Sequence, residues 1–121
     1  FLTVSASSLY SQDWLWSEFQ ENSNPTLGQN DVFAKDDFVY TTGWFYDTLR
    51  FNNGTELISQ GYLDLYVVKL DLLGNLIWAK SYGTSTGEEQ GNSIAVDNSG
   101  NIFIAGNIHQ SPTSTYDVTD S

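Results

Sequence analysis

A pattern of strands and turns occurs twice in this chain at a long interval. Phe38-Val-Tyr-Thr-Thr-Gly43 corresponds to Asn101-Ile-Phe-Ile-Ala-Gly106, so that Gly43 and Gly106 mark the same point of two successive units. Aromatic residues ahead of these segments repeat as well. Phe19 and Tyr82 are separated in the sequence by as many residues as Gly43 and Gly106, and Trp16 and Trp78 are separated by one residue fewer. Repetition at a long period predicts an array of similar units, which restricts the fold more strongly than any single residue does.

The composition favours β structure. The chain holds 4 Trp, 7 Tyr and 7 Phe, whose wide rings suit a pleated surface, and its 10 Gly supply turns. Seven strands are expected, at residues 14–19, 31–34, 38–45, 63–70, 75–82, 93–97 and 101–107. A polar loop is expected at 20–29, and the long connection at 46–60 has room for an irregular hairpin. No segment outside residues 1–12 has the spacing of an amphipathic helix.

Charge and cysteine content exclude several classes of function. Fifteen acidic and four basic residues give a net charge of −11. Nucleic acid is therefore not expected as a partner, because phosphate binding needs clustered Lys and Arg. The absence of Cys rules out disulfides, thiolate metal sites and Cys nucleophiles. No stretch approaches the roughly 20 apolar residues of a membrane-spanning helix.

A four-stranded antiparallel sheet that recurs at a long period suggests a β-propeller, because blades packed around an axis bury faces that a lone sheet would expose. The expected fold is thus all-β, a partial propeller with about one and three-quarter blades. One blade would span residues 31–82, and the next would begin at residue 93. Residues 14–19 would supply an outer strand.

The better preserved unit, residues 64–106, holds a series of turn and strand motifs. They are Asp71-Leu-Leu-Gly74-Asn75, Trp78, Ile94-Ala-Val-Asp97, Gly100-Asn101 and Gly106. With these motifs the unit resembles the SBBP (beta-propeller repeat) family, whereas residues 14–43 retain little of the pattern. Two departures are Gly83-Thr84 in place of a Gly-Gly pair and an acidic loop residue at Glu88 or Glu89. The resemblance implies a multi-bladed propeller in an exported or surface-attached bacterial protein, but it implies no reaction.

Both ends of the chain suggest part of a longer protein. The sequence contains no Met, and residues 1–12 are small, apolar and uncharged. We expect these residues to be the remnant of a secretory signal peptide, with a first β-strand at 2–5 as the alternative. Residues 13–121 would then be a propeller-repeat fragment from the N-terminal part of an exported protein.

The residues that carry chemistry are scattered. His109 has no companions at metal-ligand spacing, and a triad through it lacks a nucleophile elbow. Asp97-Asn98-Ser99-Gly100-Asn101 and Asp71-Leu-Leu-Gly74 are predicted to be turns, and Gly87-Glu88-Glu89 a solvated loop. No cofactor is predicted, and calcium is the alternative that these segments leave open.

The remaining candidates concern carbohydrate chemistry. The carboxylates Asp36, Asp37, Asp64 and Asp71 have no pattern that brings two of them together as glycosidase acids. Trp16 and Trp78 are expected to pack between blades, which leaves Trp44, after the strand-ending Gly43, as the candidate ligand contact. Asn53-Gly54-Thr55 matches a glycosylation sequon but is expected to be a turn.

These patterns favour a non-enzymatic scaffold or binding module, secreted or at the cell surface and used in adhesion. Its partners would be a protein or a glycan at the cell surface, together with further repeats of the same chain. The alternative is a carbohydrate-binding or catalytic propeller of a secreted carbohydrate-active enzyme.

Overall fold

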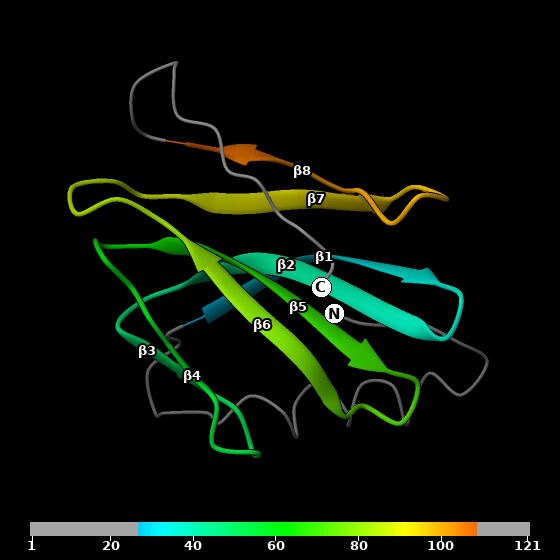
Figure 1. Cartoon of the computed structure of the whole chain (residues 1–121). Coiled ribbons are helices and arrows are strands. Elements are labelled where there is room, and N and C mark those ends of the chain that lie inside the picture. The colour runs from blue at the N-terminus through cyan, green and yellow to red at the C-terminus, as the bar shows by residue number, and fades with distance from the viewer. Residues whose placement is uncertain (1–26, 109–121) are drawn as a thin grey trace.

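A four-stranded antiparallel sheet forms the centre of the molecule. The computed structural model describes residues 27–108, and every regular element in that range is a strand. The strands lie in the order β1-β2-β5-β6, and each pairs antiparallel with its neighbour (Figure 1). Their bounds are β1 Leu27–Lys35, β2 Phe38–Phe45, β5 Asp64–Asp71 and β6 Leu76–Tyr82. The prediction of an all-β fold is confirmed.

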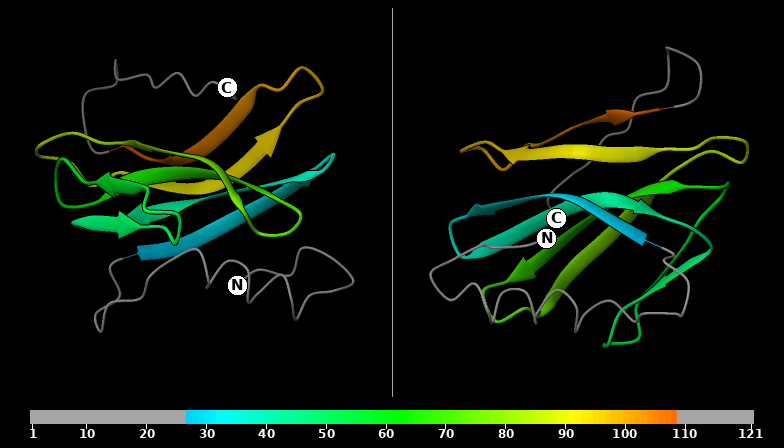
Figure 2. Two further views of the ribbon diagram at one scale, coloured as in Figure 1. Left: turned by 60° about the horizontal axis from the view of Figure 1, so that its bottom comes forward. Right: turned by 180° about the vertical axis from the view of Figure 1, so that it is seen from behind.

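Two smaller hairpins lie on opposite sides of this sheet. The first joins β3, Thr48–Arg50, to β4, Glu56–Ile58, inside the connection where an irregular hairpin was expected. The second joins β7, Gln90–Val96, to β8, Ile102–Asn107. Figures 1 and 2 show β7–β8 as a separate layer stacked on one side of the sheet, while β3–β4 lies at the other side.

Two strands begin earlier than the sequence predicted. β1 starts at Leu27, within a segment expected to be a polar loop, and β7 starts at Gln90 rather than Ser93. In both cases the added residues pair with the end of the following strand, as Leu27 does with Phe45 and Gln90 with Asn107. Backbone pairing needs no apolar side chain, so a polar sequence did not prevent it.

Alternation along β2 and β5 sends apolar side chains to both faces of the sheet. On one face the sheet packs against the β3–β4 connection. Leu49 and Phe51 from that connection are 2% and 1% exposed. The buried residues of this core are Val39, Phe45, Leu49, Phe51, Tyr66, Val68 and Leu70. Each fully buried side chain of this size contributes about 1.5–3 kcal/mol to folding.

The other face forms what we call the seam, the contact between the four-stranded sheet and β7–β8. Its buried residues come from β2, β5 and β7, and they are Tyr40, Leu65, Val67, Ile94 and Val96. Trp78 and Tyr82 of β6 pack against the same core. Trp78 therefore packs at the seam between the two sheets, in line with the prediction of packing between blades.

The hairpins β1–β2 and β7–β8 are structural repeats. In the first, Gln29 pairs with Gly43, and the register then shifts around Asn30. In the second, Gly91 pairs with Gly106, and the register shifts around Asn92. The same β-bulge therefore occurs at the same place in both hairpins, and it leaves an Asn unpaired in the ladder each time.

Equivalent residues of β1 and β7, such as Asn30 and Asn92, are one residue closer in the sequence than equivalent residues of β2 and β8, such as Gly43 and Gly106. The extra residue lies in the hairpin turn, because Lys35 pairs with Phe38 across two residues, whereas Asp97 to Asn101 closes across three. The longer turn places Gly100 at φ 83°, and the shorter one places Asp36 at φ 54°. Gly adopts this left-handed region without steric cost, whereas most other residues adopt it only at a cost.

Candidate functional site at the loop end of the seam

Two loops meet at one end of the four-stranded sheet, which we call the loop end. They are the β4–β5 loop, residues 59–63, and the β6–β7 loop, residues 83–89. The amide of Tyr62 donates to the carbonyl of Gly87 at 3.3 Å, and the amide of Glu89 donates to the carbonyl of Leu63 at 2.8 Å. These bonds fix the position from which β7 starts.

Each of these loops donates hydrogen bonds to a buried carboxylate. Asp64 is fully buried and accepts hydrogen bonds from the amides of Gln60 and Gly61 at 3.1 and 3.4 Å. Glu89 is also fully buried, and it accepts the hydroxyl of Thr84 at 2.9 Å. A buried carboxylate needs such donors, because water no longer solvates it. The prediction of a solvated 87–89 loop is therefore wrong for Glu89 but right for Glu88, which is exposed.

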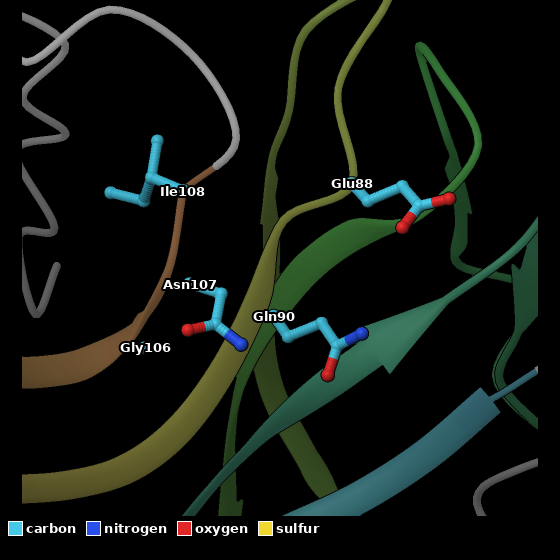
Figure 3. A pocket seen from close by; sticks show the side chains of 5 residues that line it. All are labelled: Glu88, Gln90, Gly106, Asn107 and Ile108. Atoms are coloured by element: carbon cyan, nitrogen blue, oxygen red, sulfur yellow. The ribbon is translucent and has the colours of Figure 1, made fainter.

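An open pocket of about 460 Å³ lies at the end of the β7–β8 hairpin where β7 starts and β8 ends. Glu88, Gln90 and Asn107 provide its polar side chains, and Gly106 and Ile108 complete the lining. Figure 3 shows Asn107 pointing toward Gln90 across the start of β7, with Glu88 above them. The residues come from two segments that the β7–β8 hairpin brings together. Of these three polar residues, the sequence singled out only Glu88, in a segment for which calcium binding was the alternative to a solvated loop.

Comparison of the two hairpins explains why the second one has a pocket. The register places Gln90 at the position of Gly28, and Asn107 at the position of Trp44. In the first hairpin the indole of Trp44 lies against Gly28, so closely that a Cβ there would overlap the ring. In the second hairpin a shorter amide replaces the indole, and the neighbouring position carries an amide of its own. A site filled by a ring in one repeat is thus open and polar in the next.

Trp44 itself is half-buried and lies inside β2, which continues to Phe45 rather than ending at Gly43. It shares a face of β2 with Thr42, whose hydroxyl lies against Gly91 of β7. Trp44 therefore lies on the seam side of the sheet, toward the loop end. Its role as a ligand contact stays a prediction.

Side-chain hydrogen bonds join the two repeats along the seam. Asn30 donates to the carbonyl of Gly91 at 2.9 Å and to Oδ1 of Asn92 at 3.3 Å. Further along the hairpin, Lys35 donates to Oδ1 of Asn98 at 2.7 Å. The bonds connect residues 61 to 63 positions apart, which is the repeat period to within one position. The repeat in sequence thus corresponds to direct contact in space.

Asp31 is the carboxylate of the seam. Its Oδ2 accepts the amide of Ile94 at 2.8 Å and the hydroxyl of Ser93 at 3.0 Å, and its Oδ1 accepts the amide of Val32 at 2.9 Å. Partial desolvation raises the pKa of Asp31, but these hydrogen bonds outweigh it and hold the pKa below the usual 3.8. Asp31 is therefore ionised at neutral pH and ties β1 to β7.

The segments that left calcium open are turns with satisfied carboxylates. Oδ1 of Asp97 accepts the amides of Ser99 and Asn101, and its Oδ2 accepts the Asn101 side chain at 2.8 Å. The Asn101 side chain and amide, with a smaller opposing effect of desolvation, lower the pKa of Asp97. Asp71 makes the same three bonds with Leu73 and Asn75. Within residues 27–108, no three His, Cys, Asp or Glu side chains gather as a metal site.

The four candidate glycosidase carboxylates do not share one site. Asp64 begins β5 at the loop end, and Asp71 ends the same strand. An eight-residue strand separates them by about 23 Å. Asp36 and Asp37 lie in the turn next to Asp71, because Phe38 pairs with Asp71. Asn53-Gly54-Thr55 forms the expected turn, in which Oδ1 of Asn53 accepts the Thr55 amide at 2.9 Å.

Some predicted features lie outside the described residues. They are the strand at 14–19 with Trp14, Trp16 and Phe19, the signal-peptide remnant at 1–12, and His109. Among residues 27–108 there is no helix long and apolar enough to cross a membrane.

Comparisons with known proteins agree with this architecture. Residues 77–111 match the model of the SBBP family, described as a beta-propeller repeat. The match begins in β6 and continues through the β7–β8 hairpin, so it includes the pocket residues Glu88, Gln90 and Asn107. No match was found among curated proteins, and none among solved structures. Residues 27–108 thus form an all-β fold, and residues 77–111 within this region and just beyond it match a beta-propeller repeat of the SBBP family.

Proposed function

We propose that this chain is a non-enzymatic binding module of an exported, cell-surface propeller protein that acts in adhesion. One observation carries the proposal: the open pocket at the loop end places Glu88, Gln90 and Asn107 together where the β7–β8 hairpin begins and ends. Pockets with a few convergent polar groups are the usual sites of ligand binding. Further repeats of the chain would extend the scaffold on which the pocket sits.

The placement of the carboxylates favours binding over catalysis. Asp31 and Asp71 have lowered pKa values, and their oxygens accept hydrogen bonds from the scaffold itself. Glycoside hydrolysis needs two carboxyl groups roughly 5–10 Å apart, with one of them held protonated. Asp64 and Asp71 are much farther apart than this, at opposite ends of β5. Carboxylates of this kind stabilise turns and strand contacts.

The proposal is tested in two steps. Export is tested by treating intact cells that make the protein with a protease, and the expected result is loss of the protein from the cell surface. Binding without turnover is tested by incubating the purified protein with extracellular proteins and glycans and weighing the recovered ligand by mass spectrometry. Retention of an unchanged ligand is expected. Protection from protease in intact cells would contradict export, and a chemically altered ligand would contradict a non-enzymatic role.

A further inference from the structure

We infer that the loop-end pocket takes a neutral, hydroxyl-rich ligand, that is, a saccharide unit. The inference rests on the proposed binding function and adds the ligand class. It is carried by the repeat-specific replacement of a ring and a glycine with two amides, Asn107 for Trp44 and Gln90 for Gly28. The scaffold keeps the backbone pairing at this position and changes only the chemistry that faces the pocket.

The polar lining matches hydroxyl groups in kind and number. The primary amides of Gln90 and Asn107 each offer two N–H donors and one carbonyl acceptor, and the carboxylate of Glu88 offers acceptors only. A sugar hydroxyl both donates and accepts, and neighbouring hydroxyls form a pair that one planar amide or carboxylate can bond with both of its polar atoms. Three planar groups around one pocket are therefore suited to a ring that carries several hydroxyls.

Charge disfavours an acidic ligand. Among the described residues no Lys or Arg lines the pocket, while Glu88 does. The chain as a whole has a net charge of −11, which repels anions at a distance. A phosphate, a sulfate or an acidic sugar would have to approach Glu88 without a compensating cation. A neutral saccharide has no such cost.

The apolar lining is too small to recognise a peptide by its side chains. Within the described part of the chain, Ile108 is the one large apolar residue of the lining, and it is 42% exposed. Peptide anchors need deep apolar pockets that exclude water. A sugar ring needs less, because its apolar C–H face covers a single side chain or indole. Ile108 is the side chain of the lining that is available for such a contact.

The test measures binding of the whole protein to neutral and acidic glycans on an array, followed by calorimetric titration with the best neutral sugar. We expect binding to neutral sugars, with at least a tenfold loss of affinity in Gln90→Ala and in Asn107→Ala. Asn107→Asp keeps the size of the side chain and removes its donors, so a similar loss is expected. Asn52→Ala, in the exposed β3–β4 turn, is the control and should bind as the wild type does.

Three results would overturn the inference. They are a preference for acidic glycans, unchanged affinity in all three pocket variants, and loss of binding on addition of EDTA, which would mean recognition through a bound cation. Thermal melting of each variant checks that the fold is retained. If the wild type binds no glycan but still binds another cell-surface ligand, the saccharide inference fails and the proposed binding function stands. If it binds no ligand of any class, both fail.

Discussion

Asn30 donates its side-chain amide to Oδ1 of Asn92, the residue that occupies the same position one repeat later. Both residues lie at a β-bulge, where they are unpaired in the strand ladder, and their side chains make contacts between the repeats. The stronger bond of Asn30 goes to the carbonyl next to the second bulge, that of Gly91, at 2.9 Å. The β-bulge of one repeat is therefore hydrogen-bonded to the β-bulge of the next.

Removing the amide of Asn30 should loosen the seam. Asn30→Ala deletes the donor to Gly91 and leaves the fold otherwise intact, and we expect a loss of about 1 kcal/mol in the free energy of unfolding. Asn92→Ala should cost less, because it removes only the longer bond to Asn30. Urea denaturation measures both, with Asn52→Ala as the control. Equal stability of Asn30→Ala and the control would contradict the role of the bulge.

Asp31 should make stability depend on acid pH. Its folded pKa lies below 3.8, so its contribution is present above the unfolded pKa and is lost as the pH falls through the folded pKa. Asp31→Asn should therefore lower the urea midpoint at pH 7, and the gap to the wild type should close as the pH falls below the unfolded pKa and through the lower folded pKa. Asp37→Asn, an exposed carboxylate in the β1–β2 turn, is the control. A gap that persists at low pH would contradict this assignment.

Gly83 should tolerate no side chain, because a Cβ there would overlap the buried carboxylate of Asp64. The side chain of Asp64 cannot move away easily, because its oxygens accept hydrogen bonds from the amides of Gln60 and Gly61. We expect Gly83→Ala to destabilise the protein by about 1–3 kcal/mol, the usual cost of overpacking a rigid site. Ser85→Ala, exposed in the same loop, should have little effect on the melting temperature. A melting temperature of Gly83→Ala equal to that of Ser85→Ala would show that the loop end is more adaptable.

Calcium should not stabilise the protein. The oxygens of Asp97 accept donors from Ser99 and Asn101, and those of Asp71 accept donors from the equivalent turn, so a cation would have to displace these bonds. We expect the same melting temperature in millimolar calcium and in EDTA. A rise with calcium that disappears in Asp97→Asn would instead assign a site to this turn.

Local patterns in the sequence predicted the turns well. Asp71, Gly74 and Asn75 predicted a hairpin turn, and Gly74 has the expected positive φ of 85°. Turns of this kind depend on a few neighbouring residues, whose chemistry determines the backbone conformation. The strand-favouring residues at 38–45 and 63–70 predicted β2 and β5 for the same reason.

Contacts between distant segments were not predictable from these patterns. Glu89 belongs to a polar loop by composition, and only the fold shows that Thr84 satisfies it in a buried position. The pocket depends on the match of Gln90 with Gly28 and of Asn107 with Trp44, which becomes visible only once the registers of both hairpins are known. The bulges at Asn30 and Asn92 likewise give no local signal in the sequence.

The central claim is that β7–β8 stacks on the four-stranded sheet as the next repeat, and a disulfide tests it directly because the chain has no cysteine of its own. The double variant Asn30→Cys with Asn92→Cys should form an intramolecular disulfide under mild oxidation, since the native side chains are in contact. The control pair Asn53→Cys with Asn92→Cys joins hairpins on opposite sides of the sheet and should stay reduced within the monomer. Mass spectrometry of the monomer shows which pair has closed. Closure of the Asn30–Asn92 pair alone is the predicted result, and failure of that pair to close, or equal closure of the control, would contradict the stacked arrangement.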